Sequence, residues 1–148
     1  MKVAILMGSV KDRDKMEPAS AVLSELGIEH EVFVMSAHRT PARVAEFAAG
    51  ARTAGYGAII CGAGKAAHLA GAVAAHSTLP VIGVPIAAGD LGGMDALLST
   101  VQMPTGIPVA TVAIDSAANA AYLAASMLSI SDPDIAAALI AYRDSLAG

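Results

Sequence analysis

The stretch EVFVMSAHRTPARVAEFA, residues 31–48, contains one complete strand-to-helix unit. Its first five residues are mostly apolar and predict a β-strand, and the segment after the turn predicts a helix with Pro41 at its first position. Between them, the turn from Ser36 sets the titratable imidazole of His38 beside the permanent cation of Arg39. Open α/β sheets bind ligands at the carboxyl ends of their strands, where this turn lies. The unit therefore predicts acid–base chemistry next to an anion site, with a ligand-free surface turn as the alternative.

Strand-like and helix-like segments alternate along the rest of the chain. Apolar runs predict strands at residues 3–7, 31–35, 57–61, 80–84 and 109–113. Helices are predicted at residues 12–26, 41–54, 66–76, 91–101, 117–128 and 133–146. Most of the strands are apolar on both faces, as in a parallel sheet covered by helices on each side. We therefore expect a single α/β domain over residues 1–148, a doubly wound, flavodoxin- or Rossmann-like three-layer α/β/α sandwich.

Composition narrows the class of protein. Hydrophobic residues make up 55% of the 148 residues and charged residues only 15%, which indicates that the chain hides surface in an oligomer. No apolar run reaches the roughly 18 residues that a membrane span needs. A net charge of −4, three Tyr and two Phe argue against a nucleic-acid partner. The single cysteine, Cys61, excludes an internal disulfide, and with no cationic apolar leader we expect a cytoplasmic protein.

The segment 117–125 is unusually rich in small residues, which would let another backbone approach closely. Contact with another subunit is the preferred interpretation of this segment. Packing against the chain's own sheet is about equally compatible with the pattern. The sequence leaves both open.

The loop after the first strand, residues 8–12, combines a turn glycine, the hydroxyl of Ser9 and the start of a helix. Together these features predict a site for phosphate or a similar anion. The carboxylate of Asp12 either caps the following helix or accepts hydrogen bonds from sugar hydroxyls, and capping is the favoured interpretation.

The loop after the third strand, residues 62–71, matches Gly-x-Gly-x-x-Ala, a dinucleotide-binding pattern. The context does not fit, because the motif follows the third strand and the next strand ends in Val84-Pro85, where a ribose-binding acid is expected. Its glycines would instead let backbone approach a small planar ligand. His68 is either a second polar group of the site or a plain surface residue. The connection at residues 85–95 is a plausible pocket wall or lid.

Two enzyme classes are disfavoured by the residue pattern. No cluster of Cys, His and carboxylate residues shows metal-ligand spacing, so we expect no metal site. No Gly-x-Ser-x-Gly elbow occurs, which argues against a serine hydrolase.

Several motifs in order resemble the 5-(carboxyamino)imidazole ribonucleotide mutase family of purine biosynthesis, over residues 3–128. The motifs are Met7-Gly8-Ser9 with Asp12 and Met16, Ser36 to Pro41, Gly62-Ala63-Gly64, Ala66 to Leu69, Pro80 to Pro85, Asp95, Leu97-Leu98-Ser99, Gln102-Met103-Pro104 with Gly106, Pro108 to Thr111, and Asn119-Ala120. Lys11, Lys65 and Ala70 depart from the usual Ser, Gly and Pro of the family. Arg39 and His68 resemble the mutase branch rather than the sister group, which carboxylates aminoimidazole ribonucleotide directly.

The resemblance implies a cofactor-independent isomerase that moves a carboxyl group from the exocyclic nitrogen of an aminoimidazole ribonucleotide to ring carbon four. It also implies a homo-octamer with sites at subunit contacts. Its implied catalytic residues are His38, as proton shuttle, and His68. Its implied substrate-binding residues are Ser9, Ser36 and Arg39 for the phosphate and Asp12 for the ribose. The loop from Gly62 to Leu69, including Gly64, Ala66 and Leu69, would bind the ring and carboxylate. The alternatives are the direct carboxylase and a non-catalytic nucleotide-binding regulator, which would need no His38.

Overall fold

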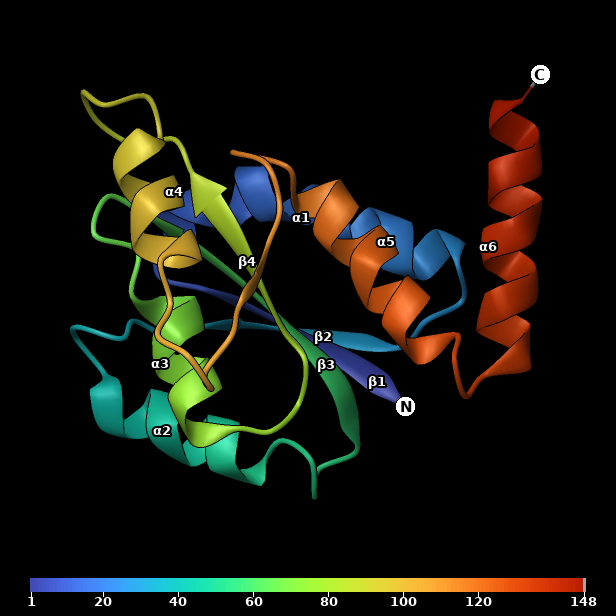
Figure 1. Ribbon diagram of the computed structural model, residues 1–148, viewed down its shortest axis with the longest axis horizontal. Coiled ribbons are helices and arrows are strands. Elements are labelled where there is room, and N and C mark those ends of the chain that lie inside the picture. The colour runs from blue at the N-terminus through green and yellow to red at the C-terminus, as the bar shows by residue number, and fades with distance from the viewer. Residues whose placement is uncertain (148) are drawn as a thin grey trace.

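The computed structural model describes residues 1–147, in which five parallel strands form one sheet in the order β2-β1-β3-β4-β5 (Figure 1). The strands are β1 (Lys2–Met7), β2 (His30–Val34), β3 (Tyr56–Gly64), β4 (Val81–Ile86) and β5 (Ala110–Thr111). A short 3-10 helix, η1 (Val10–Asp12), precedes α1 (Arg13–Glu25); the other helices are α2 (Pro41–Gly50), α3 (Leu69–His76), α4 (Met94–Val101), α5 (Ala117–Leu128) and α6 (Pro133–Leu146). The predicted doubly wound α/β fold is confirmed.

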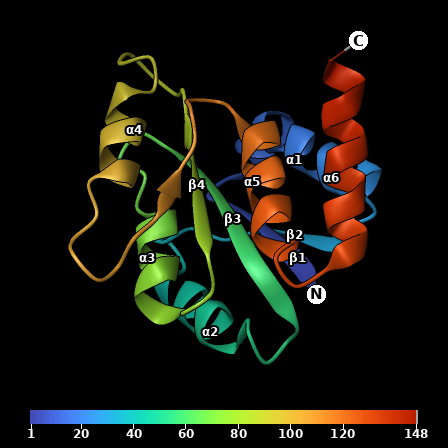
Figure 2. The ribbon, with the colours of Figure 1, turned by 45° about the vertical axis from the view of Figure 1, so that its right-hand side comes forward.

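Helices cover both faces of the sheet, as the apolar strands predict (Figures 1 and 2). Along β1, Val3 and Ile5 belong to the core under α1 and α5, whereas Ala4 and Leu6 belong to the core under α2 and α3. These alternate side chains are fully buried. Each large one contributes about 1.5–3 kcal/mol through its removal from water. A strand with both faces covered has no need of polar positions, and this explains the unbroken apolar runs.

Helix α5 packs inside the chain through its small residues. The side chains of Ala117, Ala120, Ala121, Ala124 and Ala125 are fully buried in the core that α5 shares with α1 and the sheet. The preferred interpretation of this face as a subunit contact was therefore wrong, because the close approach that alanines allow is used within the chain. Helix α6 lies outside α5, as Figure 2 shows, and the Tyr122 and Tyr142 rings stack between them with centroids 4.4 Å apart.

Two helices begin later than predicted, and the reason is clear for α4, whose predicted first turn contains two residues with left-handed backbone conformations. Helix α3 begins at Leu69 instead of residue 66, and Lys65 ahead of it has a φ of 55°. Helix α4 begins at Met94 instead of residue 91, and Gly92 and Gly93 have φ of 60° and 91°. The angles of Gly92 and Gly93 cannot belong to a right-handed helix, so α4 begins after them.

Strand β4 ends at Ile86, two residues beyond its predicted end, and therefore includes Pro85. On one side Pro85 pairs with Ala63 of β3, but pairing with β5 stops at Gly83. The carbonyl of Pro85 accepts a hydrogen bond from the backbone N–H of Asp115 (2.8 Å) rather than from a strand. Proline is tolerated here because its missing N–H leaves no ladder bond unmade. β5 is only two residues long instead of the predicted five, because its pairing with β4 is limited to Ile82 and Gly83.

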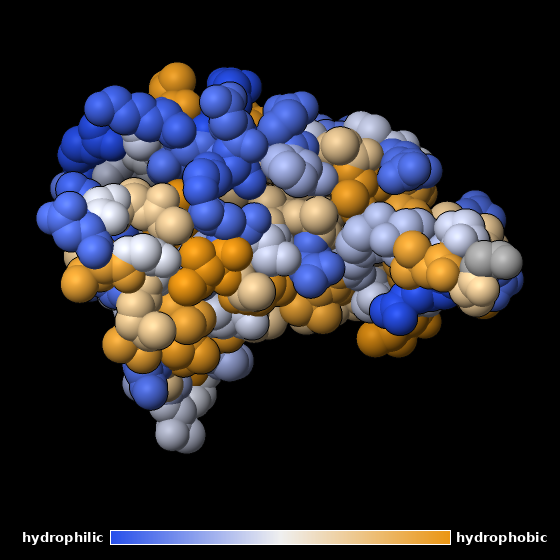
Figure 3. Space-filling view, turned by 90° about the horizontal axis from the view of Figure 1, so that it is seen from above, coloured by the Kyte–Doolittle hydropathy of each residue, from blue (hydrophilic) through white to orange (hydrophobic). Residues whose placement is uncertain are grey.

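One helix presents an apolar face to solvent. Leu91 precedes α4, and Met94, Leu98 and Val101 follow at helical spacing; their exposed fractions are 66, 52, 51 and 45%. The space-filling view shows hydrophobic side chains gathered on the left of the molecule, the side on which Figure 1 places α4 (Figure 3). No helix within residues 1–147 has the length and apolar character to cross a membrane.

The strand order determines where a ligand site forms. Strands β1 and β3 are neighbours, and their following helices cover opposite faces of the sheet, α1 one face and α3 the other. The chains leaving these two strands therefore part, and a crevice opens at their carboxyl ends.

Candidate active site

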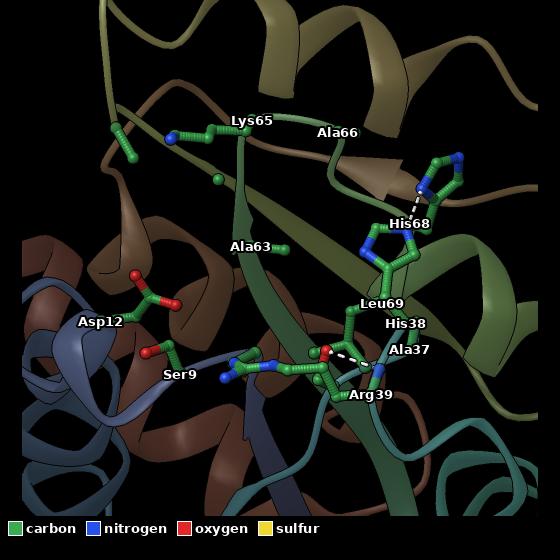
Figure 4. A pocket seen from close by; sticks show the side chains of 14 residues that line it. Ser9, Asp12, Ala37, His38, Arg39, Ala63, Lys65, Ala66, His68 and Leu69 are labelled. Carbon is green, nitrogen blue, oxygen red and sulfur yellow. Dashed lines mark hydrogen bonds between the residues drawn. The ribbon is translucent and has the colours of Figure 1, made fainter.

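A cleft of about 470 Å³ occupies this crevice. It is lined by the segments that follow β1 and β2, by the end of β3 and the residues after it, and by Ala88 after β4 (Figure 4). The structure brings all nine residues that were singled out from the sequence to this cleft: Ser9, Asp12, Ser36, His38, Arg39, Gly64, Ala66, His68 and Leu69. Residues up to 60 positions apart in the chain meet because parallel strands end at one edge of the sheet.

Two imidazoles meet at one side of the cleft. The Nε2 atom of His38 lies 2.6 Å from Nδ1 of His68, with the ring centroids 4.7 Å apart and the planes at 79° (Figure 4). The bond requires a proton on one nitrogen and a lone pair on the other, so the rings cannot both be fully protonated while it persists. The pair can therefore accept a proton at one ring and hold it next to the other.

The turn that carries His38 is held by its own hydrogen bonds. The backbone N–H of Thr40 donates to the carbonyl of Ser36 (2.8 Å), and the N–H of Ser36 donates to the Thr40 hydroxyl (3.0 Å). The N–H of Arg39 donates to the Ser36 hydroxyl oxygen at 3.3 Å. These bonds close the loop between β2 and α2. The orientation of the His38 and Arg39 side chains is therefore set by hydrogen bonds within the turn itself.

The opposite side of the cleft is suited to an anion. The guanidinium of Arg39 donates to the carbonyl of Gly8 (2.8 Å), which fixes it beside the end of β1. The Ser9 oxygen accepts from the N–H of Lys11 (3.2 Å) and so caps η1, which leaves its hydroxyl proton available for a ligand. A planar cation, a hydroxyl donor and a helix start together form a site for phosphate or carboxylate.

Asp12 faces the cleft and does not cap its helix. Although it precedes α1, its side chain makes no capping hydrogen bond. Partial burial raises the pKa of its carboxyl, against the opposing effects of a hydrogen bond with the Ser9 backbone and the charge of Arg39. The favoured capping interpretation was therefore wrong, and the carboxylate is available to accept hydrogen bonds from hydroxyl groups of a ligand. Figure 4 shows it above Ser9, on the side away from the histidines.

The third loop supplies the small residues of the cleft. Ala63 lies between the histidine pair and the Ser9 side, and Gly64 follows it (Figure 4). A Cβ atom at Gly64 would lie 2.8 Å from the Cβ atom of Ala88, so only glycine leaves this space open. His68 directly precedes α3 rather than lying in its first turn, and Leu69 is buried beneath the cleft. These side chains leave room for a flat ligand against backbone.

Five lining residues were not singled out individually from the sequence as ligand-binding: Gly8, Ala37, Ala63, Lys65 and Ala88. Lys65 was noted only as a departure from a family pattern, and Ala88 lay in a loop interpreted as a possible pocket wall. The rule that ligands bind at strand ends would have pointed to both. The remaining nucleophile, Cys61, is buried in the sheet, where burial raises the pKa of its thiol. Within residues 1–147, no three His, Cys, Asp or Glu side chains are grouped to hold a metal ion.

The fold and the cleft define a doubly wound α/β protein with a ligand site at its switch point. The model of the AIR carboxylase family matches residues 2–148, and the chain belongs to this family. The resemblance inferred from the motifs is confirmed.

Relatives of known name cover nearly the whole chain. The N5-carboxyaminoimidazole ribonucleotide mutase of Thermotoga maritima is 50% identical over 145 residues, 98% of this chain and 85% of that protein. The enzyme of the same name from Aquifex aeolicus is 55% identical over 134 residues, 90% of this chain and 80% of that protein. A phosphoribosylaminoimidazole carboxylase of Schizosaccharomyces pombe is 47% identical over 97% of this chain but only 26% of its own length. The crystal structure of Treponema denticola PurE superposes with a TM-score of 0.89 at 32% identity, covering 98% of this chain and 90% of that one.

Proposed function

We propose that this chain is an N5-carboxyaminoimidazole ribonucleotide mutase, an isomerase of purine biosynthesis. The reaction moves a carboxyl group from the exocyclic nitrogen of the ribonucleotide to ring carbon four. The relatives that carry this name are about half identical over nearly the full chain. The observation that carries the proposal is the His38–His68 hydrogen bond, which places proton-transfer groups across the cleft from an anion site.

The reaction requires two proton transfers, one to the exocyclic nitrogen and one from ring carbon four. As the carbamate C–N bond breaks, the exocyclic nitrogen takes a proton and carbon dioxide is released. Ring carbon four then attacks the carbon dioxide to form a C–C bond and afterwards loses its own proton. In the proposal, His38 donates the first proton and accepts the second, and His68 holds its imidazole through the 2.6 Å bond. With the substrate bound in the cleft, carbon dioxide would be released next to carbon four. We include no metal or organic cofactor, because the C–N cleavage and the C–C bond formation balance with the transfer of one proton and no redox change.

The substrate would lie along the cleft with its phosphate at the Arg39 end. There the Ser9 and Ser36 hydroxyls and the guanidinium would bind the phosphate oxygens, and the Asp12 carboxylate would accept hydrogen bonds from the ribose. The ring and carboxylate would lie over the third loop, against the remaining predicted binding residues, Gly64, Ala66 and Leu69.

The proposal includes assembly of this one catalytic domain into a homo-octamer with sites at subunit contacts. The exposed apolar face of α4 supports assembly, because Met94, Leu98 and Val101 together with Leu91 form a contiguous stripe. Soluble monomers rarely leave such a patch uncovered. Burying it against another copy of the chain would recover its hydrophobic free energy.

The experiment that tests the function is an absorbance assay of isomerisation with the N-carboxylated ribonucleotide. We expect His38→Asn to abolish turnover while the fold, followed by circular dichroism, and ligand affinity, followed by calorimetry, stay close to those of the wild type. His76→Asn is the matched control, since His76 lies at the far end of α3 and outside the cleft. A near-normal rate in the His38 variant would contradict the assignment.

The direct carboxylase is the second candidate, and the name of the Schizosaccharomyces pombe relative favours it. That enzyme class would accept aminoimidazole ribonucleotide together with carbon dioxide. The two functions separate in one comparison. A mutase converts the N-carboxylated substrate without added bicarbonate, whereas a direct carboxylase leaves that substrate unchanged and requires bicarbonate with aminoimidazole ribonucleotide.

A further inference from the structure

Lys65 is a charged rim residue of the cleft for which the fold provides a special backbone position. Its φ of 55° lies in the left-handed region, which is unfavourable for a residue with a Cβ atom. Asp115 is the other non-glycine residue with positive φ within residues 1–147, and its carboxylate and N–H are both hydrogen-bonded. Unfavourable backbone angles of this kind cluster at active sites and ligand-binding sites, where the strain is part of the function.

The neighbouring loop makes room for the Lys65 side chain. A Cβ atom at Gly89 would lie 3.2 Å from Cε of Lys65 and 3.9 Å from Nζ. The absence of a side chain at Gly89 therefore lets the lysine stem lie over the loop after β4. Figure 4 shows this stem running along the rim, away from the histidine pair. Since the stem is a flexible four-carbon chain, its ammonium can turn toward a ligand.

Within residues 1–147 the ammonium of Lys65 forms no ion pair. The ion pairs within residues 1–147 are Lys2–Glu31 and Lys15–Asp115, and Lys65 belongs to neither. Of the residues that line the cleft, only Arg39 and Lys65 carry permanent positive charges. Figure 4 places them on opposite sides of Ala63. Arg39 is already anchored to the carbonyl of Gly8, on the phosphate side.

We propose that Lys65 is a substrate-binding residue whose ammonium pairs with the carboxylate of the imidazole ligand, across the cleft from the phosphate. The inference rests on the proposed function, because only a ligand with two separated anionic groups needs both cations. The substrate and product of the mutase are such ligands, and aminoimidazole ribonucleotide, which lacks the carboxylate, is not. Lys65 thereby favours the carboxylated ribonucleotides over the decarboxylated one and helps the enzyme to retain the group it moves.

The test compares two ligands by calorimetry. The first is the carboxylated product, 4-carboxy-5-aminoimidazole ribonucleotide, and the second is aminoimidazole ribonucleotide. Lys65→Met keeps most of the stem and removes the charge, so we expect the dissociation constant of the carboxylated ligand to rise about three- to tenfold. That of the decarboxylated ligand should change by less than about twofold. Lys65→Arg should restore the preference, and added salt should weaken it in the wild type.

Arg143→Met is the matched control, because it removes one positive charge from α6, outside the cleft, and should leave both affinities unchanged. Lys65→Gly separates charge from backbone: an equal loss of preference in the Gly and Met variants assigns the effect to the ammonium. If Lys65→Met changes both affinities equally, or neither, the proposal for Lys65 is overturned while the mutase function stands. If the wild type binds neither nucleotide, the function itself is wrong and the role of Lys65 with it.

Discussion

The tight contact between the third and fourth strand ends predicts the effect of one added methyl group. In Gly64→Ala, the new Cβ atom would lie 2.8 Å from Cβ of Ala88 and 3.2 Å from the carbonyl oxygen of Ile86. Two carbons in ordinary contact are about 3.5–4.0 Å apart, so the first distance is roughly 0.7–1.2 Å too short. The second atom belongs to the backbone of a buried strand, in register with Gly64 itself. The strand ends must therefore separate.

Overpacking of this kind costs about 1–3 kcal/mol of the free energy of unfolding. In urea we expect the unfolding midpoint of Gly64→Ala to fall by about 0.5–2 M, with the slope unchanged. The chain concentration must be the same for all variants, because assembly makes apparent stability depend on it. Gly8→Ala is the control at the end of β1: its Cβ would meet nothing within 4 Å, so its stability should equal or slightly exceed that of the wild type.

A double-mutant cycle identifies the contact. Ala88→Gly removes the nearest atom and leaves only the Ile86 oxygen at 3.2 Å, so in that background the cost of Gly64→Ala should shrink by about 1 kcal/mol or more. Equal costs in the two backgrounds would refute the packing argument, since the strain would then come from elsewhere.

Two further predictions concern charged groups. Arg39→Ala should weaken binding of the phosphorylated ligand about ten- to a hundredfold in calorimetry, because a charge-assisted hydrogen bond is lost; unchanged binding would remove Arg39 from the site. At Asp115, partial burial acts to raise the pKa of the carboxyl, but bonds from Lys15 and the N–H of Ala87 outweigh it, so the folded pKa is lowered. This stabilisation is present above the unfolded pKa of about 3.9 and is lost as pH falls through the folded pKa, so Asp115→Asn should flatten the loss of stability below about pH 4 in urea titrations. If the free energy of unfolding of Asp115→Asn fell as steeply below about pH 4 as that of the wild type, the role of Asp115 would be contradicted.

The layered fold and most of the cleft were accessible from the sequence, because both depend on local pattern. Apolar runs with no polar face require helices on both sides of a sheet, and the alternation of strand and helix leaves few topologies. Because parallel strands end at one edge, Ser9, His38 and His68 could be assigned to one place without knowing any distance. The element boundaries were less accessible, as at Gly92 and Gly93, whose left-handed backbone angles delay the start of α4.

The class of fold, the family and the residue types that meet at the strand ends could thus be read from the sequence. How those residues are used depends on contacts between segments far apart in the chain. In the tertiary structure, His38 and His68 are hydrogen-bonded, and Asp12 lines the cleft and does not cap a helix. The alanines of α5 are buried within the chain. The structure also places the ammonium of Lys65, which forms no ion pair within residues 1–147, on the opposite side of Ala63 from Arg39. Periodicity and turn chemistry act between residues that are near neighbours in the sequence, so a sequence pattern reports them. A hydrogen bond between residues 30 positions apart depends instead on the register and twist of the whole sheet.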